Sequence, residues 1–146
     1  MALAQLQLLV KVQQEKEDKL QAQYRAALLN YQSMQQKYQG LADYRIEYVQ
    51  QTQQRGQQGM ESRNFNQYLN FIGKLDAALT QQQHYVQQAK TTSEQRLQQL
   101  LAMQKKRKAL EILIERELTE QQRKADKQEQ KMLDEIATQQ FFRRVV

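Results

Sequence analysis

The stretch Gln54-Arg55-Gly56-Gln57-Gln58-Gly59 interrupts a pattern that is otherwise helical, and it decides the fold of this chain. Gly56 and Gly59 give the backbone the freedom that ends one helix and lets the chain reverse. Aromatic residues are sparse elsewhere but gather on both sides of this break, in Asp43-Tyr44-Arg45-Ile46-Glu47-Tyr48 and in Asn64-Phe65-Asn66-Gln67-Tyr68-Leu69-Asn70-Phe71-Ile72. The chain is therefore predicted to run out as one helix, turn once and return as a second, with the two aromatic clusters opposite each other.

The composition favours helices over a globular core. Among 146 residues there are four glycines and no proline, cysteine or tryptophan. Turns use proline and glycine, so their scarcity predicts few turns. A mean hydropathy of -0.92 is too polar for a large core and is typical of a narrow apolar seam between long helices. The predicted fold class is all-α, a long antiparallel two-helix coiled coil, or helical hairpin, whose second helix is longer and overhangs the first.

The boundaries follow from the break. Residues 1–146 are predicted to form a single helical-hairpin rod, with Ser62 as the N-cap of the second helix. Its parts are helix one over about 3–53, a turn over about 54–62, helix two over about 63–138 and a tail over 139–146.

Apolar residues recur in each helix at alternating steps of three and four, which predicts the seam of a coiled coil. Polar residues interrupt this seam at a few positions, and they are expected to reach water at its edge. A reversal near positions 57–58 pairs residue i with residue 115 minus i, so Met1 is predicted to lie opposite Ile114. In helix one the seam is Leu6, Val10, Gln13, Glu17, Leu20, Tyr24, Ala27, Tyr31, Met34, Tyr38, Leu41, Arg45 and Tyr48. In helix two it is Phe65, Tyr68, Ile72, Leu75, Leu79, Gln82, Val86, Ala89, Ser93, Arg96, Leu100, Met103, Arg107, Leu110 and Ile114.

Everything beyond about Glu115 is then predicted to have no partner within the chain. This overhang is polar nearly all round, and Glu120 and Lys124 have the spacing of a local ion pair. A short apolar end follows, with Met132, Leu133, Ile136 and Phe141-Phe142-Arg143-Arg144-Val145-Val146. A docking tip, a contact with a membrane surface and a frayed end all remain open for it.

The formal charge of +6 indicates an acidic partner, or a weak attraction to nucleic acid or an anionic membrane surface. The run Lys105-Lys106-Arg107-Lys108 is the strongest charge feature, but consecutive positions spread around a helix and no aromatic residue interleaves for base stacking. A solvated face is therefore the favoured interpretation, an anionic protein partner the second and nucleic acid the third. No signal peptide is predicted, and no apolar run is long enough to span a membrane.

No catalytic, cofactor-binding or metal-ligating constellation is found in the sequence. His84 has no carboxylate or second histidine at ligand spacing. Gly56 and Gly59 lack the Gly-Lys-Ser/Thr ending of a phosphate-binding loop. Carboxylates on an exposed pair of helices have no pocket that would shift their pKa values. We therefore expect no enzyme activity and no cofactor.

The chain resembles the FliJ family of bacterial flagellar type III export proteins, which are two-helix chains of similar length. The likeness extends in length and helical organisation over nearly the whole chain, and its specific residues lie between about 41 and 79. The family pattern Leu-x-x-Tyr-x-x-x-Tyr is present as Leu41, Tyr44 and Tyr48. A glycine-containing turn follows, and then an aromatic-rich opening of the second helix. The pattern Phe-Ile-x-x-Leu-x-x-Ala is present there as Phe71, Ile72, Leu75 and Ala78.

The resemblance implies a cytoplasmic, stalk-like protein of flagellum biogenesis, and so of motility and chemotaxis, peripherally associated with the inner membrane at the flagellar base. Its implied partners are the flagellar export ATPase ring, whose assembly and activity it would promote, the cytoplasmic domain of the membrane export gate, and export chaperones. By resemblance, the gate-binding residues would be Leu41, Tyr44, Tyr48, Phe71, Leu75 and Ala78. The candidate ring-binding residues on the overhang are Arg116, Arg123, Lys124 and Lys127.

The residues alone add one expectation and leave two alternatives open. Tyr44 and Phe71 lie off the predicted seams, so both are expected to be exposed near the turn, as aromatic residues at binding sites often are. The alternatives are a basic coiled coil that binds nucleic acid and a structural rod that self-associates through its weak seam.

Overall fold

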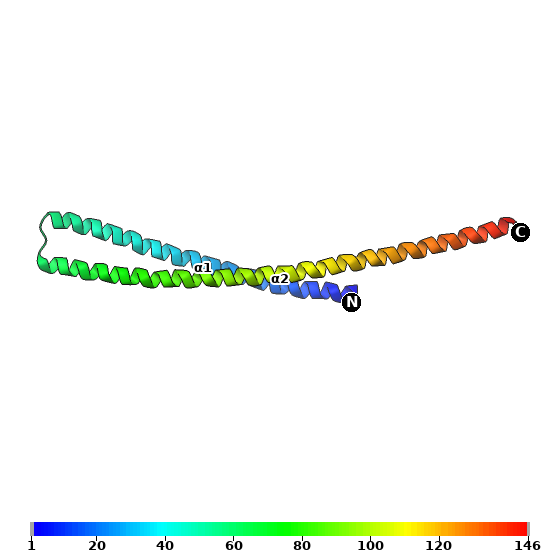
Figure 1. Cartoon of the computed structure of the whole chain (residues 1–146), viewed down its shortest axis with the longest axis horizontal. Coiled ribbons are helices and arrows are strands. Elements are labelled where there is room, and N and C mark those ends of the chain that lie inside the picture. The colour runs from blue at the N-terminus through cyan, green and yellow to red at the C-terminus, as the bar shows by residue number, and fades with distance from the viewer. Residues whose placement is uncertain (1, 146) are drawn as a thin grey trace. The chain divides into compact units, whose positions relative to one another are not determined.

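A computed structural model describes residues 2–145 as two α-helices (Figure 1). They are α1 (Leu3–Gln57), of 55 residues, and α2 (Ser62–Val145), of 84 residues. Residues 58–61 join them, and no strand occurs among the described residues. The predicted all-α hairpin of two packed helices, the second longer than the first, is therefore confirmed.

The turn begins later than predicted. Gly56 stays within α1, which ends at Gln57 and not near Gln53. Gly59 has a φ of 92°, a left-handed conformation that glycine adopts without strain, so the reversal takes place there. The amides of Gln58 and Gly59 donate to the carbonyls of Arg55 (3.1 Å) and Gly56 (3.2 Å), which closes the last turn of α1.

The start and end of α2 also differ from the prediction. The amide of Phe65 donates to the carbonyl of Glu61 (3.0 Å), so Glu61 takes the cap position and the predicted N-cap, Ser62, is the first helical residue. The predicted tail at 139–146 is helical as far as Val145. No glycine or proline interrupts it, and the Thr138 hydroxyl bonds back to the Asp134 carbonyl (2.8 Å), as threonine does inside helices.

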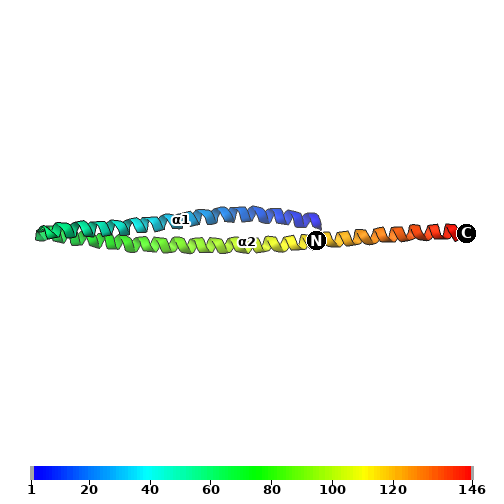
Figure 2. The same ribbon diagram turned by 90° about the horizontal axis from the view of Figure 1, so that it is seen from above.

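Contacts divide the chain into two units, and each is described by itself. The hairpin unit is Lys19–Leu101, in which α1 and α2 lie side by side and antiparallel in both views (Figures 1 and 2). The terminal unit is Met1–Asp18 with Ala102–Val146, in which the first turns of α1 lie beside α2 and α2 continues beyond them. That the chain forms a single domain stays a prediction.

The predicted seam is confirmed at all but one position. Every position assigned to it in α1, from Leu6 to Tyr48, is buried or half-buried, and so is every one in α2 from Tyr68 to Ile114. The most buried apolar side chains are Leu6, Leu75, Ala89 and Leu100. Phe65 is the exception and is 50% exposed. It lies in the first turn of α2, directly after the residues that join the two helices.

The observed pairing of residues between α1 and α2 is shifted relative to the predicted register. Gln82 reaches Met34, close to the predicted partner position 33, but Arg107 reaches Glu17 where position 8 was expected. The longer α1 and the later turn move the pairing along the chain. As a result, half-buried positions in α2 continue to Glu120, and all of 121–145 is exposed. The unpartnered part of α2 therefore begins after Glu120 and not after Glu115; Met1, predicted to face Ile114, lies outside the described residues.

Candidate partner-binding surfaces

Five aromatic rings form a continuous cluster next to the turn. Tyr48 occupies its centre, with ring centroids 4.5 Å from Phe71 and 5.6 Å from Tyr68, on which it stacks. Tyr44 meets the edge of Phe71 at 6.2 Å and Tyr48 at 6.4 Å. Phe65 extends the row at 6.3 Å from Tyr68. Such offset and edge-to-face contacts stabilise aromatic pairs beyond the area they bury, so the cluster ties the two helices together.

The aromatic residues that the resemblance assigns to gate binding come together within this cluster. Tyr44 is 49% exposed, which confirms the prediction for this residue. The prediction is wrong for Phe71, which is half-buried because it packs against the rings of both Tyr48 and Tyr44. Tyr44 thus presents the largest accessible part of the predicted surface.

The three aliphatic members of the same set lie deeper. Leu75 is only 7% exposed and belongs to the core between the helices, while Leu41 and Ala78 are half-buried. Leu75 therefore has little surface to offer a partner, and its main contribution is to packing. Whether any of these residues binds the export gate stays a prediction.

An ion pair flanks the aromatic cluster. The Arg45 Nε–H donates to Asp76 Oδ1 at 2.6 Å across the two helices. This hydrogen bond, together with the charge of Asp76, raises the pKa of Arg45 above its ordinary value. Periodicity places Arg45 in the seam. It does not reveal Asp76 as the partner, because the predicted register puts position 70 opposite Arg45.

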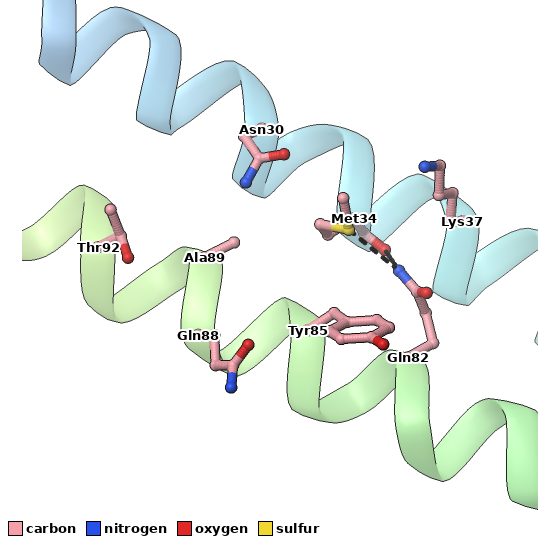
Figure 3. A pocket seen from close by; sticks show the side chains of 8 residues that line it. All are labelled: Asn30, Met34, Lys37, Gln82, Tyr85, Gln88, Ala89 and Thr92. Atoms are coloured by element: carbon pink, nitrogen blue, oxygen red, sulfur yellow. Dashed lines mark hydrogen bonds between the residues drawn. The ribbon is translucent and has the colours of Figure 1, made fainter.

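A cavity of about 450 Å³ opens between α1 and α2 in the hairpin unit (Figure 3). Met34 points from α1 toward α2, and Gln82 Nε2 donates to the Met34 carbonyl at 3.0 Å. The small side chain of Ala89 leaves space beside the ring of Tyr85. The eight lining residues include one cation, Lys37, and no carboxylate, so the cavity has no acid–base pair for catalysis. They are Asn30, Met34, Lys37, Gln82, Tyr85, Gln88, Ala89 and Thr92.

Most of the polar residues that interrupt the seam form hydrogen bonds within the chain, which corrects the expectation that they reach water, but the buried amide oxygen of Gln13 has no hydrogen-bond partner among the described residues. In the terminal unit, Arg107 donates through Nε (2.5 Å) and Nη2 (3.3 Å) to both carboxylate oxygens of Glu17, which is only 6% exposed. Arg107 Nη1 also donates to Glu111 (2.8 Å). The bonds to Glu17 and Glu111 raise the pKa of Arg107.

Among the other interruptions in the hairpin unit, Arg45 pairs with Asp76. The remaining ones bond to neutral groups. The Ser93 hydroxyl donates to the Lys90 carbonyl (2.8 Å), and Arg96 Nη1 reaches the amide oxygens of Gln23 (3.4 Å) and Gln99 (3.3 Å). Among the described residues, Glu17–Arg107 is thus the ion pair in which both partners occupy seam positions, since Asp76 lies outside the seam. Because Arg107 turns inward, the basic run at 105–108 also loses one of its four cations as a docking site for nucleic acid.

The candidate ring-binding residues are all exposed on α2: Arg116, Arg123, Lys124 and Lys127. Glu120 pairs with Arg123 (2.7 Å), three residues on, and not with Lys124 as the spacing suggested. The hydrogen bond from Arg123 is the main cause that lowers the pKa of Glu120, and the charges of Arg123 and Lys124 add to it. Among the described residues, Arg123 is thus the member of this group whose charge is paired within the chain.

A carbon-13 NMR titration of the Glu120 carboxyl is expected to give a pKa below the usual range for glutamate. The Arg123→Gln variant should move this pKa back toward the usual range, and Lys124→Gln should move it less. Because the pKa is lowered, the pair supports the helix above the ordinary pKa of glutamate and is lost as the pH falls through the lowered value. An unchanged titration in Arg123→Gln would show that the pair does not form in solution.

Among the described residues, no group of three or more His, Cys, Asp or Glu side chains is arranged to hold a metal ion. In the same part of the chain, no helix has the length and apolar character needed to cross a membrane.

Comparison with known proteins gives one match. A family model described as "Flagellar FliJ protein" matches residues 1–145, which is nearly the whole chain. Searches of curated proteins and of solved structures returned no match.

Proposed function

The chain belongs to the flagellar FliJ family, and from this premise we propose that it acts as a stalk-like factor that promotes assembly and activity of the flagellar export ATPase ring. Membership makes it a flagellar export-associated protein, since the family is a structural component of export rather than a family of enzymes. The family implies a cytoplasmic component. We further propose that it couples the ring to the cytoplasmic domain of the export gate, helps to escort export chaperones and associates peripherally with the inner membrane through these partners.

The unpartnered part of α2 supports this proposal. Residues 121–145 remain helical while every one of their side chains is exposed. A helix whose apolar side chains all stay exposed gains little stability from its own chain, so a surrounding partner is a physical reason for it to persist. The exposed cations Arg116, Arg123, Lys124 and Lys127 would suit an acidic lining of such a partner.

The test is the ATP hydrolysis rate of the cognate flagellar export ATPase, measured alone, with the full chain and with a chain cut after Glu120. The cut removes only exposed residues and keeps the paired seam, so circular dichroism and thermal unfolding should show the remaining helices intact. We expect the full chain to raise the rate several-fold and the shortened chain to leave it near the basal value.

A second variant separates charge from length. Replacing Arg123, Lys124 and Lys127 together by glutamine keeps the helix, since glutamine is also a good helix former. If the cations contact the ring, this variant should stimulate less, and the stimulation by the unaltered chain should fall as salt rises. Equal stimulation by the full and shortened chains would move the contact away from residues 121–145, and no stimulation by either would refute the proposed role at the ring.

A further inference from the structure

A pocket opens at the turn end of the hairpin unit. This tip pocket has a volume of about 340 Å³ and is lined by Thr52, Gln53, Gly56, Met60, Phe65 and Tyr68. Phe65 is half exposed, although its spacing places it in line with the seam. A fold that needed Phe65 only for packing would bury more of the ring, since burial of an aromatic side chain is strongly favourable.

Gly56 in the tip pocket has no structural requirement for glycine. It lies within α1 and has no positive φ, and an added Cβ would meet no atom within 4 Å. Alanine at such a helical position is more favourable than glycine. The missing side chain keeps the pocket open instead, as glycine does where another molecule must approach the backbone closely.

A polar pocket adjoins the tip pocket. It has a volume of about 530 Å³ and shares Thr52, Met60 and Tyr68 with the tip pocket. Its other lining residues include Arg55, Asn64 and Gln67, which offer hydrogen-bond donors. We name it the Arg55 pocket.

The charges around the two pockets favour an anion. Between residues 49 and 70 the basic side chains are Arg55 and Arg63, and the one acidic side chain is Glu61. The first turn of α2 contains no acidic residue, and Glu61 at its cap position is one carboxylate against the two cations and the partial positive charge of the helix end. An acidic group of a partner would therefore be attracted to this end of the hairpin unit.

We propose that this end is a docking site for an acidic peptide segment that carries one large aliphatic side chain. The aliphatic side chain enters the tip pocket against Phe65, Tyr68 and Met60. A neighbouring carboxylate lies in the Arg55 pocket and accepts hydrogen bonds from Arg55. The two pockets are contiguous through Met60, so adjacent residues of one segment reach both. The site adjoins the predicted gate surface, because Tyr48 lines the Arg55 pocket, but it does not coincide with that surface, because Tyr44, Phe71 and Leu75 line neither pocket.

The test uses the full chain with carbon-13 labelled methionine methyl groups and the peptide acetyl-Ser-Asp-Leu-Asp-Ser-amide as the probe. The Met60 methyl signal is expected to shift in a saturable way, while the signals of Met34 and Met132, which line neither pocket, stay unchanged. Gly56→Leu should fill the pocket and weaken the affinity by about tenfold or more, as loss of an anchoring pocket does. Its thermal stability should not fall, because leucine is the better helix former.

Matched controls make the outcome decisive. Gly40→Leu changes another helical glycine with open space around it, away from both pockets, and should leave the affinity unchanged. Arg55→Gln should weaken binding of the acidic probe. No saturable shift of Met60, an equal shift with acetyl-Ser-Lys-Leu-Lys-Ser-amide, or unaltered affinity in Gly56→Leu would each overturn the proposal. Because the probe is a free peptide, none of these results depends on the export ATPase or the gate.

Discussion

Leu75→Ala is expected to lower the free energy of unfolding by about 2–4 kcal/mol, the range for truncating a buried leucine. Leu75 is 7% exposed and lies between the helices, where α1 is the only element that could close the gap. Urea unfolding followed by circular dichroism measures the change. Leu75 also belongs to the set that the family resemblance assigns to gate binding. The stability of the Leu75→Ala variant must therefore be known before any loss of binding is interpreted.

Two controls separate folding from recognition. Leu69→Ala changes the same residue type on the same helix, but Leu69 is 49% exposed, so it should lose less than about 1 kcal/mol, as surface substitutions do. Tyr44→Ala removes an exposed ring, and it should preserve most of the stability while weakening binding to the gate domain about tenfold, as loss of an aromatic anchor does.

Calorimetric titration of the gate domain into each variant, at a temperature where circular dichroism shows it folded, completes the comparison. Unchanged gate affinity of the folded Leu75→Ala variant would assign Leu75 to the core. Wild-type affinity in Tyr44→Ala would remove the accessible part of the aromatic cluster from the predicted gate surface. A Leu75→Ala variant as stable as Leu69→Ala would contradict the packing described for the seam.

The seam could be predicted because it depends only on periodicity. Steps of three and four residues place side chains on one face of any helix, so positions such as Tyr24 and Val86 follow from spacing alone. The position of the turn is harder to predict from the sequence, because Gly56 and Gly59 both permit a helix to end. Of these two glycines, Gly59 takes the left-handed conformation. That difference lengthened α1 and moved the register.

The partner-binding residues were harder to place, because exposure depends on the register and on neighbouring rings. Phe71 lies off the predicted seam but is covered by Tyr48 and Tyr44, which a one-face pattern does not reveal. Phe65 fits the spacing of the seam but lies in the first turn of α2, beside the turn, and is half exposed. The sequence also showed Glu17 and Arg107 only as separate interruptions, because a pair across two helices is visible only once the register is known.

Arg107→Met is expected to release the first turns of α1 from α2 in the terminal unit. The substitution leaves the Glu17 carboxylate, 6% exposed, without its cation, and a buried unpaired charge is strongly unfavourable. Hydrogen exchange should show amides of residues 3–18 exchanging at least about tenfold faster, as expected for local opening. Residues 19–101 should keep their protection.

The size of this effect follows from the charge that is left behind and not from the lost bond alone. Arg96→Met provides the matched control, because Arg96 is also half-buried in the seam but bonds only to the neutral amides of Gln23 and Gln99, so no charge is stranded. It should change exchange little. The double variant Glu17→Leu with Arg107→Met removes both charges and should restore or exceed the original protection, as replacing a buried ion pair by apolar residues often does. The double variant could instead exchange as fast as Arg107→Met. That result would mean that the Glu17–Arg107 ion pair itself, and not only neutralisation of Glu17, is needed to hold α1 against α2.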